Sequence, residues 1–298
     1  MPLPVGGRSM PKVRLSELKV KDLMTVDVVY ATVPGSRRDV LKLMRERGVT
    51  GMPVVKKDTR KLIGMITRTD LVSKPAEEQV ALIMTRDPLT VSPDDLVVDA
   101  ARLLVEHNIR RLPVVEGEDL VGIITVADIV YKALADSDFD DPVADYMERR
   151  VLAVWEGTPL PVALSIMRLA GVQALVVLDS SSNLSGIITD ADLMKLSEVV
   201  FKERVSSSGI VSEGQEWDWD VSTMIYIGRG ELSLPDKPVS EVMTKRLITT
   251  LEFTPLNECA KRMKRHDINQ LPVVDSEGRL IGMVYDHALL RRLLKQPL

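Results

Sequence analysis

The chain has 298 residues, of which 45% are hydrophobic and 28% charged, and its net charge is −4. These proportions are typical of a globular protein with its own core, and the small net charge excludes a strong overall attraction to nucleic acid or an anionic membrane. A single cysteine, Cys259, excludes a disulfide framework and a cysteine-based zinc site and fits a reducing cytoplasm. The apolar runs are shorter than the roughly 18 residues that span a bilayer, and residues 1–17 are expected to form a leader without the apolar core of a signal peptide.

An internal repeat organises most of the chain, in four copies. Each copy begins near a methionine, at Met24, Met84, Met147 and Met243. A valine-rich landmark follows 29 residues later in every copy (24 to 53, 84 to 113, 147 to 176 and 243 to 272). The copies end in the related segments GMITRTDLV, GIITVADIV, GIITDADLM and GMVYDHALL. Because four ungapped matches over this distance are not expected by chance, the repeat defines the architecture.

Each copy predicts the element order β-α-β-β-α. Apolar residues four apart, such as Val40 and Met44, indicate the first helix. That helix is predicted to end at residue types that tolerate a left-handed turn, namely Gly48, Asn108, Gly171 and Asp267. Two valine- and isoleucine-rich runs separated by a polar turn then predict a strand hairpin before a second helix. The fold class is therefore α/β (α+β), and copies of about 60 residues are expected to pair because each alone buries too little surface.

The predicted boundaries place repeat 1 at 18–75, repeat 2 at 76–137, repeat 3 at 138–197 and repeat 4 at 236–298. The acidic link ADSDFDDP between repeats 2 and 3 is a plausible boundary between two halves. An insertion occupies 198–235 and contains GQEWDWD, with two of the three tryptophans. This segment is either an interface element or lid, or a surface loop that packs its tryptophans on its own domain.

The four copies of the pattern MT, LPVV and GIITxxD, from which Glu148 and the fourth GIITxxD segment depart, resemble cystathionine-β-synthase (CBS) domains, and the resemblance covers nearly the whole chain apart from the insertion. It implies two tandem pairs, or Bateman modules, in a disc-like assembly with adenosyl ligands in clefts between paired units. The closest functional analogue in that family is the nucleotide-sensing γ subunit of AMP-activated protein kinase, which also has four copies.

Three copies keep a threonine and, three residues later, an aspartate: Thr67 and Asp70, Thr125 and Asp128, Thr189 and Asp192. One interpretation is structural, because this spacing at a strand-to-helix junction is typical of a helix capping box. The other follows from the resemblance, which implies that the aspartate binds a ribose while the threonine faces the phosphate at the helix N-terminus. The fourth copy has Tyr285 and Ala288 at these positions, with Asp286 as an alternative cap, and we expect it to have lost its ligand.

Further candidates come from positions beside the landmarks. Arg110 and Arg111 match basic phosphate-reading positions of the kinase γ subunit, and arginine suits bidentate phosphate contacts. The alternative is an exposed loop pair without function. The threonines of the MT dipeptides, Thr25, Thr85 and Thr244, are expected to line the clefts, since family members use that loop beside the ligand.

The remaining polar residues have simpler interpretations. His107 and His266 are expected to cap helix C-termini, whereas His287 has no convincing partner. The segment KRMKRH (261–266) is expected to be a solvated helix face. No metal-ligand cluster is visible in the sequence.

Together these features predict a cytoplasmic regulatory protein that binds an adenine nucleotide (AMP, ADP or ATP), has no catalytic activity of its own and signals to a separate protein partner or through its own oligomer. One alternative is a binder of another adenosyl ligand, such as S-adenosylmethionine or methylthioadenosine. Another is a scaffold or nucleic-acid-binding protein with vestigial clefts, although no membrane contact is expected and nucleic acid is disfavoured by the charge. A monomer and a homodimer fit the sequence equally well.

Overall fold

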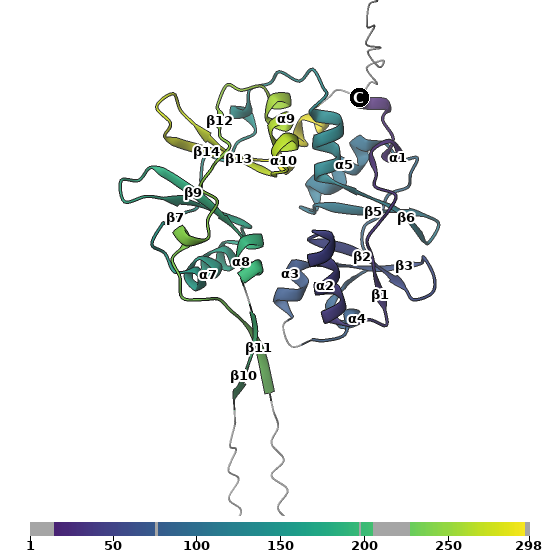
Figure 1. The fold of residues 1–298 in the computed structure, drawn as a ribbon. Coiled ribbons are helices and arrows are strands. Elements are labelled where there is room, and N and C mark those ends of the chain that lie inside the picture. Colours follow the sequence, from purple (N-terminus) through teal and green to yellow (C-terminus); the bar gives the residue numbers. More distant parts are fainter. Residues whose placement is uncertain (1–14, 75–76, 197, 205–226, 296–298) are drawn as a thin grey trace, which may run out of the picture.

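The computed structural model describes residues 15–74, 77–196, 198–204 and 227–295. Within these ranges the chain forms four units with the predicted β-α-β-β-α order, so the predicted fold class is confirmed. Units 1 and 2 form a first pair and units 3 and 4 a second pair, and the two pairs lie side by side (Figure 1). The chain segments 1–14 and GQEWDWD lie outside the described residues.

The elements of the first pair follow in chain order. Unit 1 is preceded by η1 (Leu15–Glu17) and α1 (Val20–Leu23) and contains β1 (Ala31–Val33), α2 (Arg37–Arg47), β2 (Gly51–Lys56), β3 (Leu62–Thr67) and α3 (Arg68–Ser73). Unit 2 contains α4 (Val80–Ile83), β4 (Thr85–Arg86), α5 (Val97–Glu106), β5 (Arg111–Glu116), β6 (Asp119–Thr125), α6 (Val126–Ile129) and the π-helical turn η2 (Val130–Leu134).

The second pair repeats the scheme. Unit 3 contains η3 (Val143–Asp145), β7 (Ala153–Trp155), α7 (Leu160–Ala170), β8 (Ala174–Leu178), β9 (Leu184–Thr189) and α8 (Asp190–Leu196). The hairpin of β10 (Glu198–Arg204) and β11 (Ile227–Ser233) then projects from the body (Figure 1). Unit 4 contains η4 (Val239–Glu241), β12 (Thr250–Leu251), α9 (Leu256–His266), β13 (Gln270–Val274), β14 (Leu280–Tyr285), α10 (Asp286–Leu289) and α11 (Arg291–Leu294).

The first helix of every unit ends as its sequence predicts. The four residues expected in a left-handed turn all have positive φ: Gly48 (65°), Asn108 (49°), Gly171 (66°) and Asp267 (50°). Such a turn reverses the chain directly into the next strand. In units 1, 3 and 4 that strand pairs parallel with the first strand and antiparallel with the third. In unit 2 the parallel pairing consists of a single bridge between Val91 and Val114.

In each pair, the residue that follows the repeat methionine of one unit pairs with the third strand of the other unit. In the first pair, Thr25 pairs with Ile123 of unit 2, while Thr85 pairs with Met65 of unit 1. The second pair does the same through the bridges Glu148–Met283 and Ile187–Thr244. The repeat methionine of each unit packs against the glycine of its partner's third strand, so a Cβ added there would lie 2.4–3.1 Å from the methionine Sδ. The glycine of GMIT and GIIT therefore gives room for a close contact between units.

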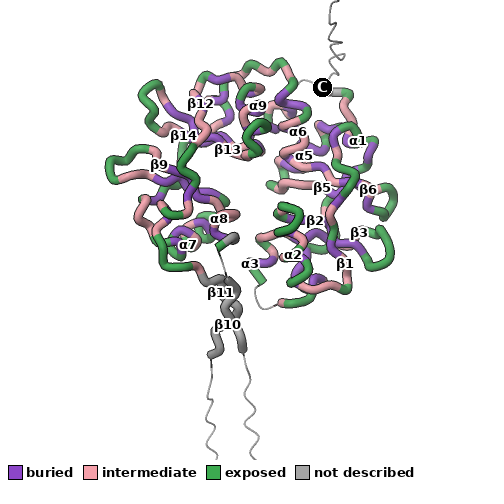
Figure 2. Tube along the Cα trace, in the orientation of Figure 1, coloured by how far each residue is buried: buried purple, intermediate pink, exposed green. Residues whose placement is uncertain are grey.

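The two pairs meet asymmetrically. One buried cluster combines residues of unit 2, such as Leu104 and Ile129, with residues of unit 4, such as Met263 and Leu289. Units 1 and 3 have separate clusters of their own. Figure 2 shows these buried segments as purple stretches inside each unit. The described helices include none long and apolar enough to cross a membrane.

Candidate functional site

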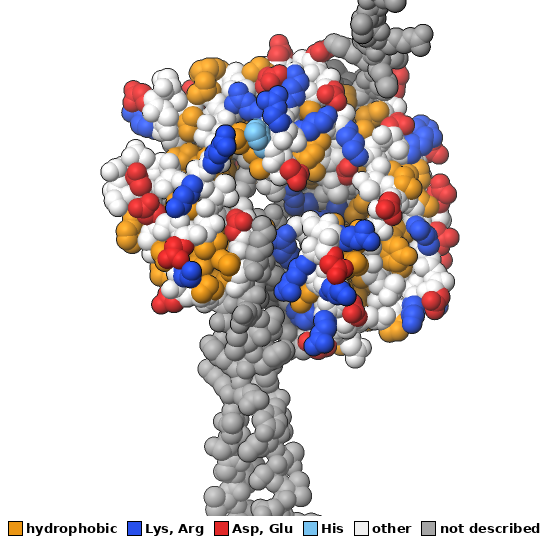
Figure 3. Space-filling view, in the orientation of Figure 1, with side chains coloured by type: hydrophobic (Ala, Val, Ile, Leu, Met, Phe, Trp, Pro, Cys, Tyr) orange, Lys and Arg blue, Asp and Glu red, His pale blue; other side chains and the backbone are white. Residues whose placement is uncertain are grey.

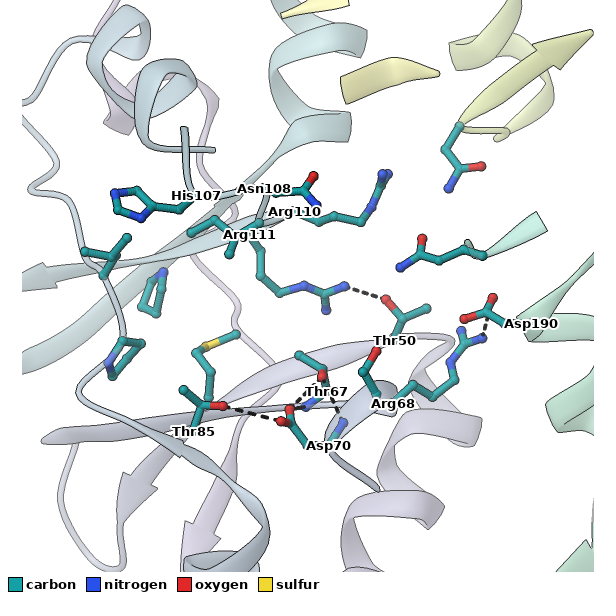
Figure 4. Close-up of a pocket in the computed structure, with 18 of the residues that line it drawn as sticks. Thr50, Thr67, Arg68, Asp70, Thr85, His107, Asn108, Arg110, Arg111 and Asp190 are labelled. Atoms are coloured by element: carbon teal, nitrogen blue, oxygen red, sulfur yellow. Dashed lines mark hydrogen bonds and ion pairs between the residues drawn. The ribbon is translucent and has the colours of Figure 1, made fainter. Parts of the chain in front are cut away.

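A cavity of about 700 Å³ lies between the two pairs, a volume typical of small-molecule sites. Residues of all four units line it, among them Thr67, Arg68, Asp70, Thr85, Arg110, Arg111, Gln173, Asp190, Asn269 and Gln270 (Figure 4). They converge because the first residue after each unit's third strand donates its backbone N–H to the carbonyl just before the second strand. These bonds join Arg68 to Thr50, Val126 to Arg110, Asp190 to Gln173 and Asp286 to Asn269, at 2.8–3.0 Å.

The Thr–Asp pair of unit 1 forms a capping box at the start of α3. Thr67 Oγ1 donates to Asp70 Oδ2 at 2.6 Å, and the same oxygen accepts the Thr67 N–H at 2.8 Å. In return, the Asp70 N–H donates to Thr67 Oγ1 at 3.4 Å. The pairs Thr125–Asp128 and Thr189–Asp192 make the same three bonds. The structural interpretation of the three pairs is therefore confirmed.

The second carboxylate oxygen distinguishes the first two of these aspartates. Among the described residues, Asp70 Oδ1 accepts only a long hydrogen bond of 3.3 Å from Thr85 Oγ1, across the join between units 1 and 2. Asp128 Oδ1 instead accepts from Lys132 Nζ at 2.7 Å, and that ammonium also donates to the Leu23 carbonyl at 2.6 Å. Lys74 is the matching lysine of unit 1, but it donates to carbonyls of α4. Asp70 thus faces the cavity, whereas Asp128 is held by a lysine.

Three arginines of the first pair face the cavity, each with a different partner. Arg111 donates to Thr50 Oγ1 and the Gly51 carbonyl, and it has no carboxylate partner within the described residues. Its burial lowers its pKa to about 10, and the charges of Arg110 and Arg68 act in the same direction. In Figure 3, blue side chains lie at the rim of the hollow between the two pairs. Arg111 is therefore a partly buried cation without a compensating charge among the described residues, which favours an anionic ligand.

Arg110 and Arg68 are paired with acids of the second pair of units. Arg110 makes a bidentate ion pair with Asp286, at 3.1 and 2.6 Å, and Asp286 has no exposed surface. Arg68 lies 3.6 Å from Asp190, beyond hydrogen-bond distance. Burial raises the pKa of Asp190, although Arg68 lowers it. All three cations thus come from the first pair of units, and both acids from the second.

The fourth unit uses its modified segment differently. Tyr285 provides no side-chain cap, and Asp286 Oδ1 accepts the His287 N–H at 2.6 Å. Asp286 thus takes part of the capping role that was predicted for it, while its main partner is Arg110. The prediction that His287 has no partner is wrong, because its Nε2 lies 2.9 Å from the Leu104 carbonyl oxygen.

The cavity brings together only some of the predicted site residues. Thr67, Asp70, Thr85, Arg110, Arg111 and Thr189 line it, whereas Thr25, Thr125, Asp128, Asp192 and Thr244 are not among its lining residues. Sequence reasoning missed Arg68 and Asp190. Both occupy the column that directly follows the GIIT threonine, and the opposite charges in that column were an unused signal.

The other polar predictions are simpler to report. His107 is the C-terminal cap of α5, and His266 is the last residue of α9. Lys264, Arg265 and His266 are exposed, as expected for a solvated helix face. Within the described ranges no cluster of His, Cys, Asp and Glu could hold a metal ion.

These repeats define a protein of the CBS-domain family. The family model described as "CBS domain" matches residues 20–77, 79–134, 143–198 and 239–295, and the chain therefore belongs to that family. The expected four-copy architecture is confirmed by this match.

Several known proteins are similar to the chain. An uncharacterized conserved protein from Pyrococcus horikoshii is 32% identical, with a TM-score of 0.64 over 93% of this chain and 100% of the other. Protein MJ1225 from Methanocaldococcus jannaschii, described as a putative archaeal homolog of the γ subunit of AMPK, is 23% identical, with a TM-score of 0.71 over 92% and 99% of the two chains. At that identity the likeness concerns the fold. An uncharacterized 33.4 kDa protein of Thermofilum pendens is 31% identical over 58% of this chain and 62% of its own length.

Adenosyl ligands occur in neighbouring structures of shorter proteins. The structure of CBSX2 is of a complex with AMP, and it matches 39% of this chain at 35% identity and a TM-score of 0.36.

Proposed function

We propose that this protein binds an adenine nucleotide in the cavity between its two pairs of units and acts as a cytoplasmic regulatory protein without catalysis of its own. One observation carries the proposal, namely that Asp70 and Arg111 line the same cavity. A ribose needs a hydrogen-bond acceptor and a phosphate needs a cation, and these two residues supply both.

The ribose contact follows from the weak bond at Asp70. Its Oδ2 is committed to the capping box, but among the described residues its Oδ1 accepts only from Thr85 at 3.3 Å. A ribose hydroxyl that donates to this oxygen would make a charge-assisted bond, which is shorter and stronger. Asp70 is already oriented by Thr67, so little further ordering would be needed.

The phosphate contact follows from Arg111. Its guanidinium is partly buried beside two other arginines, so a phosphate would relieve both the desolvation and the mutual repulsion of these cations. Methylthioadenosine carries no anionic group and would leave this charge uncompensated. S-adenosylmethionine offers one carboxylate, but its ammonium and sulfonium groups would add positive charge beside the three arginines. A nucleotide therefore fits the cavity better than those adenosyl compounds.

Regulation would arise because the cavity has walls from both pairs of units. A ligand that contacts both pairs stabilises one of their relative arrangements, and a protein partner could recognise that arrangement. Asp128 and Asp192, with the threonines beside them, remain predicted ribose and phosphate contacts of further clefts.

Isothermal titration calorimetry of the purified chain with AMP, ADP, ATP and S-adenosylmethionine tests the proposal. We expect nucleotide binding that is lost in Asp70→Ala and weakened in Arg111→Ala, with S-adenosylmethionine binding more weakly. Asp58→Asn, in an exposed turn whose φ of 62° asparagine tolerates, is the control for the loss of a carboxylate. Absence of binding by every adenosyl ligand, after removal of any co-purified nucleotide, would leave the Thr–Asp pairs as helix caps alone and favour a scaffold.

A further inference from the structure

The charges that face the cavity are not equally available to a ligand. Arg110 is neutralised by a bidentate contact with the buried Asp286. Arg68 is partly neutralised by Asp190 at 3.6 Å, and Arg111 has no acidic partner within the described residues. The cavity therefore offers one unpaired cation and a second that is shared with a carboxylate.

Among its described lining residues, the wall from the second pair of units adds no positive charge. At the positions that match Arg110 and Arg111, unit 3 has Gln173 and Ala174, and unit 4 has Asn269 and Gln270. Gln173, Asn269 and Gln270 line the cavity and can donate hydrogen bonds, but they do not compensate negative charge. Asp190 is the one charged residue that the described part of this wall contributes to the lining.

Asp190 lies beside Arg68, on the wall that a longer phosphate chain would approach. Figure 4 shows Arg68 between Asp70 and Asp190. A nucleotide with its ribose at Asp70 would place its first phosphate near Arg111 and Arg68. Each additional phosphate would extend toward the second pair of units, where it meets the Asp190 carboxylate, and like charges at short range repel strongly.

We propose that Asp190 makes this cavity selective for a nucleoside monophosphate over the corresponding triphosphate. The inference rests on the proposed function, since it assumes that the ribose lies at Asp70. Two further observations support it. The ion pair with Arg68 is too long for a hydrogen bond, so a single phosphate can replace Asp190 at that cation. Burial already disfavours the charged form of Asp190 and raises its pKa, so a second negative charge nearby would be opposed further.

The test compares AMP and ATP by isothermal titration calorimetry in a magnesium-free buffer, so that no metal ion masks the phosphate charge. The chain and the variant Asp190→Asn, which keeps size and removes charge, are measured side by side. Asp58→Asn is the matched control, because Asp58 is exposed and its φ of 62° is tolerated by asparagine. Thermal denaturation verifies that both variants are folded.

We expect the unmodified chain to bind AMP at least about tenfold more tightly than ATP, the scale of one nearby unit charge at a partly exposed site. Asp190→Asn should narrow this ratio mainly by strengthening ATP binding, and Asp58→Asn should leave it unchanged. Arg68→Gln should weaken ATP more than AMP, because it leaves Asp190 without its counter-charge. Equal affinities in the unmodified chain, or an unchanged ratio in Asp190→Asn, would overturn the role of Asp190 while leaving nucleotide binding established. Failure to bind either nucleotide would instead overturn the proposed function.

Discussion

Arg110 donates one hydrogen bond from each terminal nitrogen to the Asp286 carboxylate, and this partly buried contact joins the second unit to the fourth. The two residues are 176 positions apart in the chain. The segment without a Thr–Asp pair thus provides the counter-charge for an arginine whose sequence position predicts a phosphate contact. The fourth unit has Ala288 in place of the aspartate, and its acidic residue, Asp286, pairs with Arg110 instead of a threonine.

Removing Arg110 should destabilise the protein substantially. Arg110→Ala leaves the Asp286 carboxylate buried without its cation, and breaking a buried pair in this way costs about 3–5 kcal/mol of unfolding free energy. Urea denaturation measures this loss. Lys61→Ala is the control, because it breaks the exposed pair with Glu118 and should cost less than about 1 kcal/mol. Equal losses in the two variants would show that Asp286 does not depend on Arg110.

Two glycines that receive a partner's methionine should differ in their tolerance of alanine. At Gly64 an added Cβ would lie 2.8 Å from both the Met84 Sδ and the backbone oxygen of Thr85. At Gly122 it would lie 2.6 Å from the Met24 Sδ, but 3.4 Å from the nearest backbone oxygen. A methionine can move aside and a paired strand cannot, so Gly64→Ala should cost about 1–3 kcal/mol of unfolding free energy and Gly122→Ala less. Thermal unfolding of the two variants would contradict this order if Gly122→Ala were the less stable.

Lys132 should weaken ligand binding at Asp128, in the second cleft of the first pair. Because Lys132 already occupies Asp128 Oδ1, Asp128→Ala should change nucleotide affinity less than Asp70→Ala does. Lys132→Ala should free that oxygen and add a second binding event in calorimetry. Lys74→Ala is the matched control, since Lys74 contacts carbonyls of α4 rather than a capping aspartate. A larger effect of Asp128→Ala than of Asp70→Ala would place the ligand in the other cleft.

Asp190 should give the protein a small pH-dependent instability. Its pKa is raised in the folded state above the ordinary value of 3.8, so the folded protein binds this proton more tightly than the unfolded chain. Ionised Asp190 therefore lowers stability at neutral pH, and this cost disappears as the pH falls through the raised pKa and below 3.8. Asp190→Asn should be slightly more stable than the unmodified chain at pH 7, with the difference vanishing in acid. Denaturation curves across that range would refute the expectation if the difference grew as the pH fell.

The sequence predicted the features that repeat within a unit. The helix ends at Gly48, Asn108, Gly171 and Asp267 follow from local backbone preferences, and all four were predicted. The capping boxes were predicted for the same reason, because a threonine and an aspartate three residues apart interact within one helical turn. The fold within each unit could therefore be predicted largely from local backbone and side-chain geometry.

The contacts between pairs of units could not be predicted in this way. Arg68 meets Asp190, and Arg110 meets Asp286, only because the two pairs face each other with their strand ends together. No periodicity in the sequence encodes that arrangement. Lys132 illustrates the same limit, because Lys74 stands at the matching position of unit 1 and has a different partner.

The four repeat methionines have a consequence for how such a protein can evolve. Within each pair, both methionines pack on the other member's glycine, so neither member is complete without its mate. A deletion that removed one unit would expose the methionine of the remaining unit and leave the glycine of its third strand without a packing partner. A pair of units is thus the smallest segment that a gene can gain or lose without such damage. The four methionine–glycine contacts therefore favour proteins with an even number of these units.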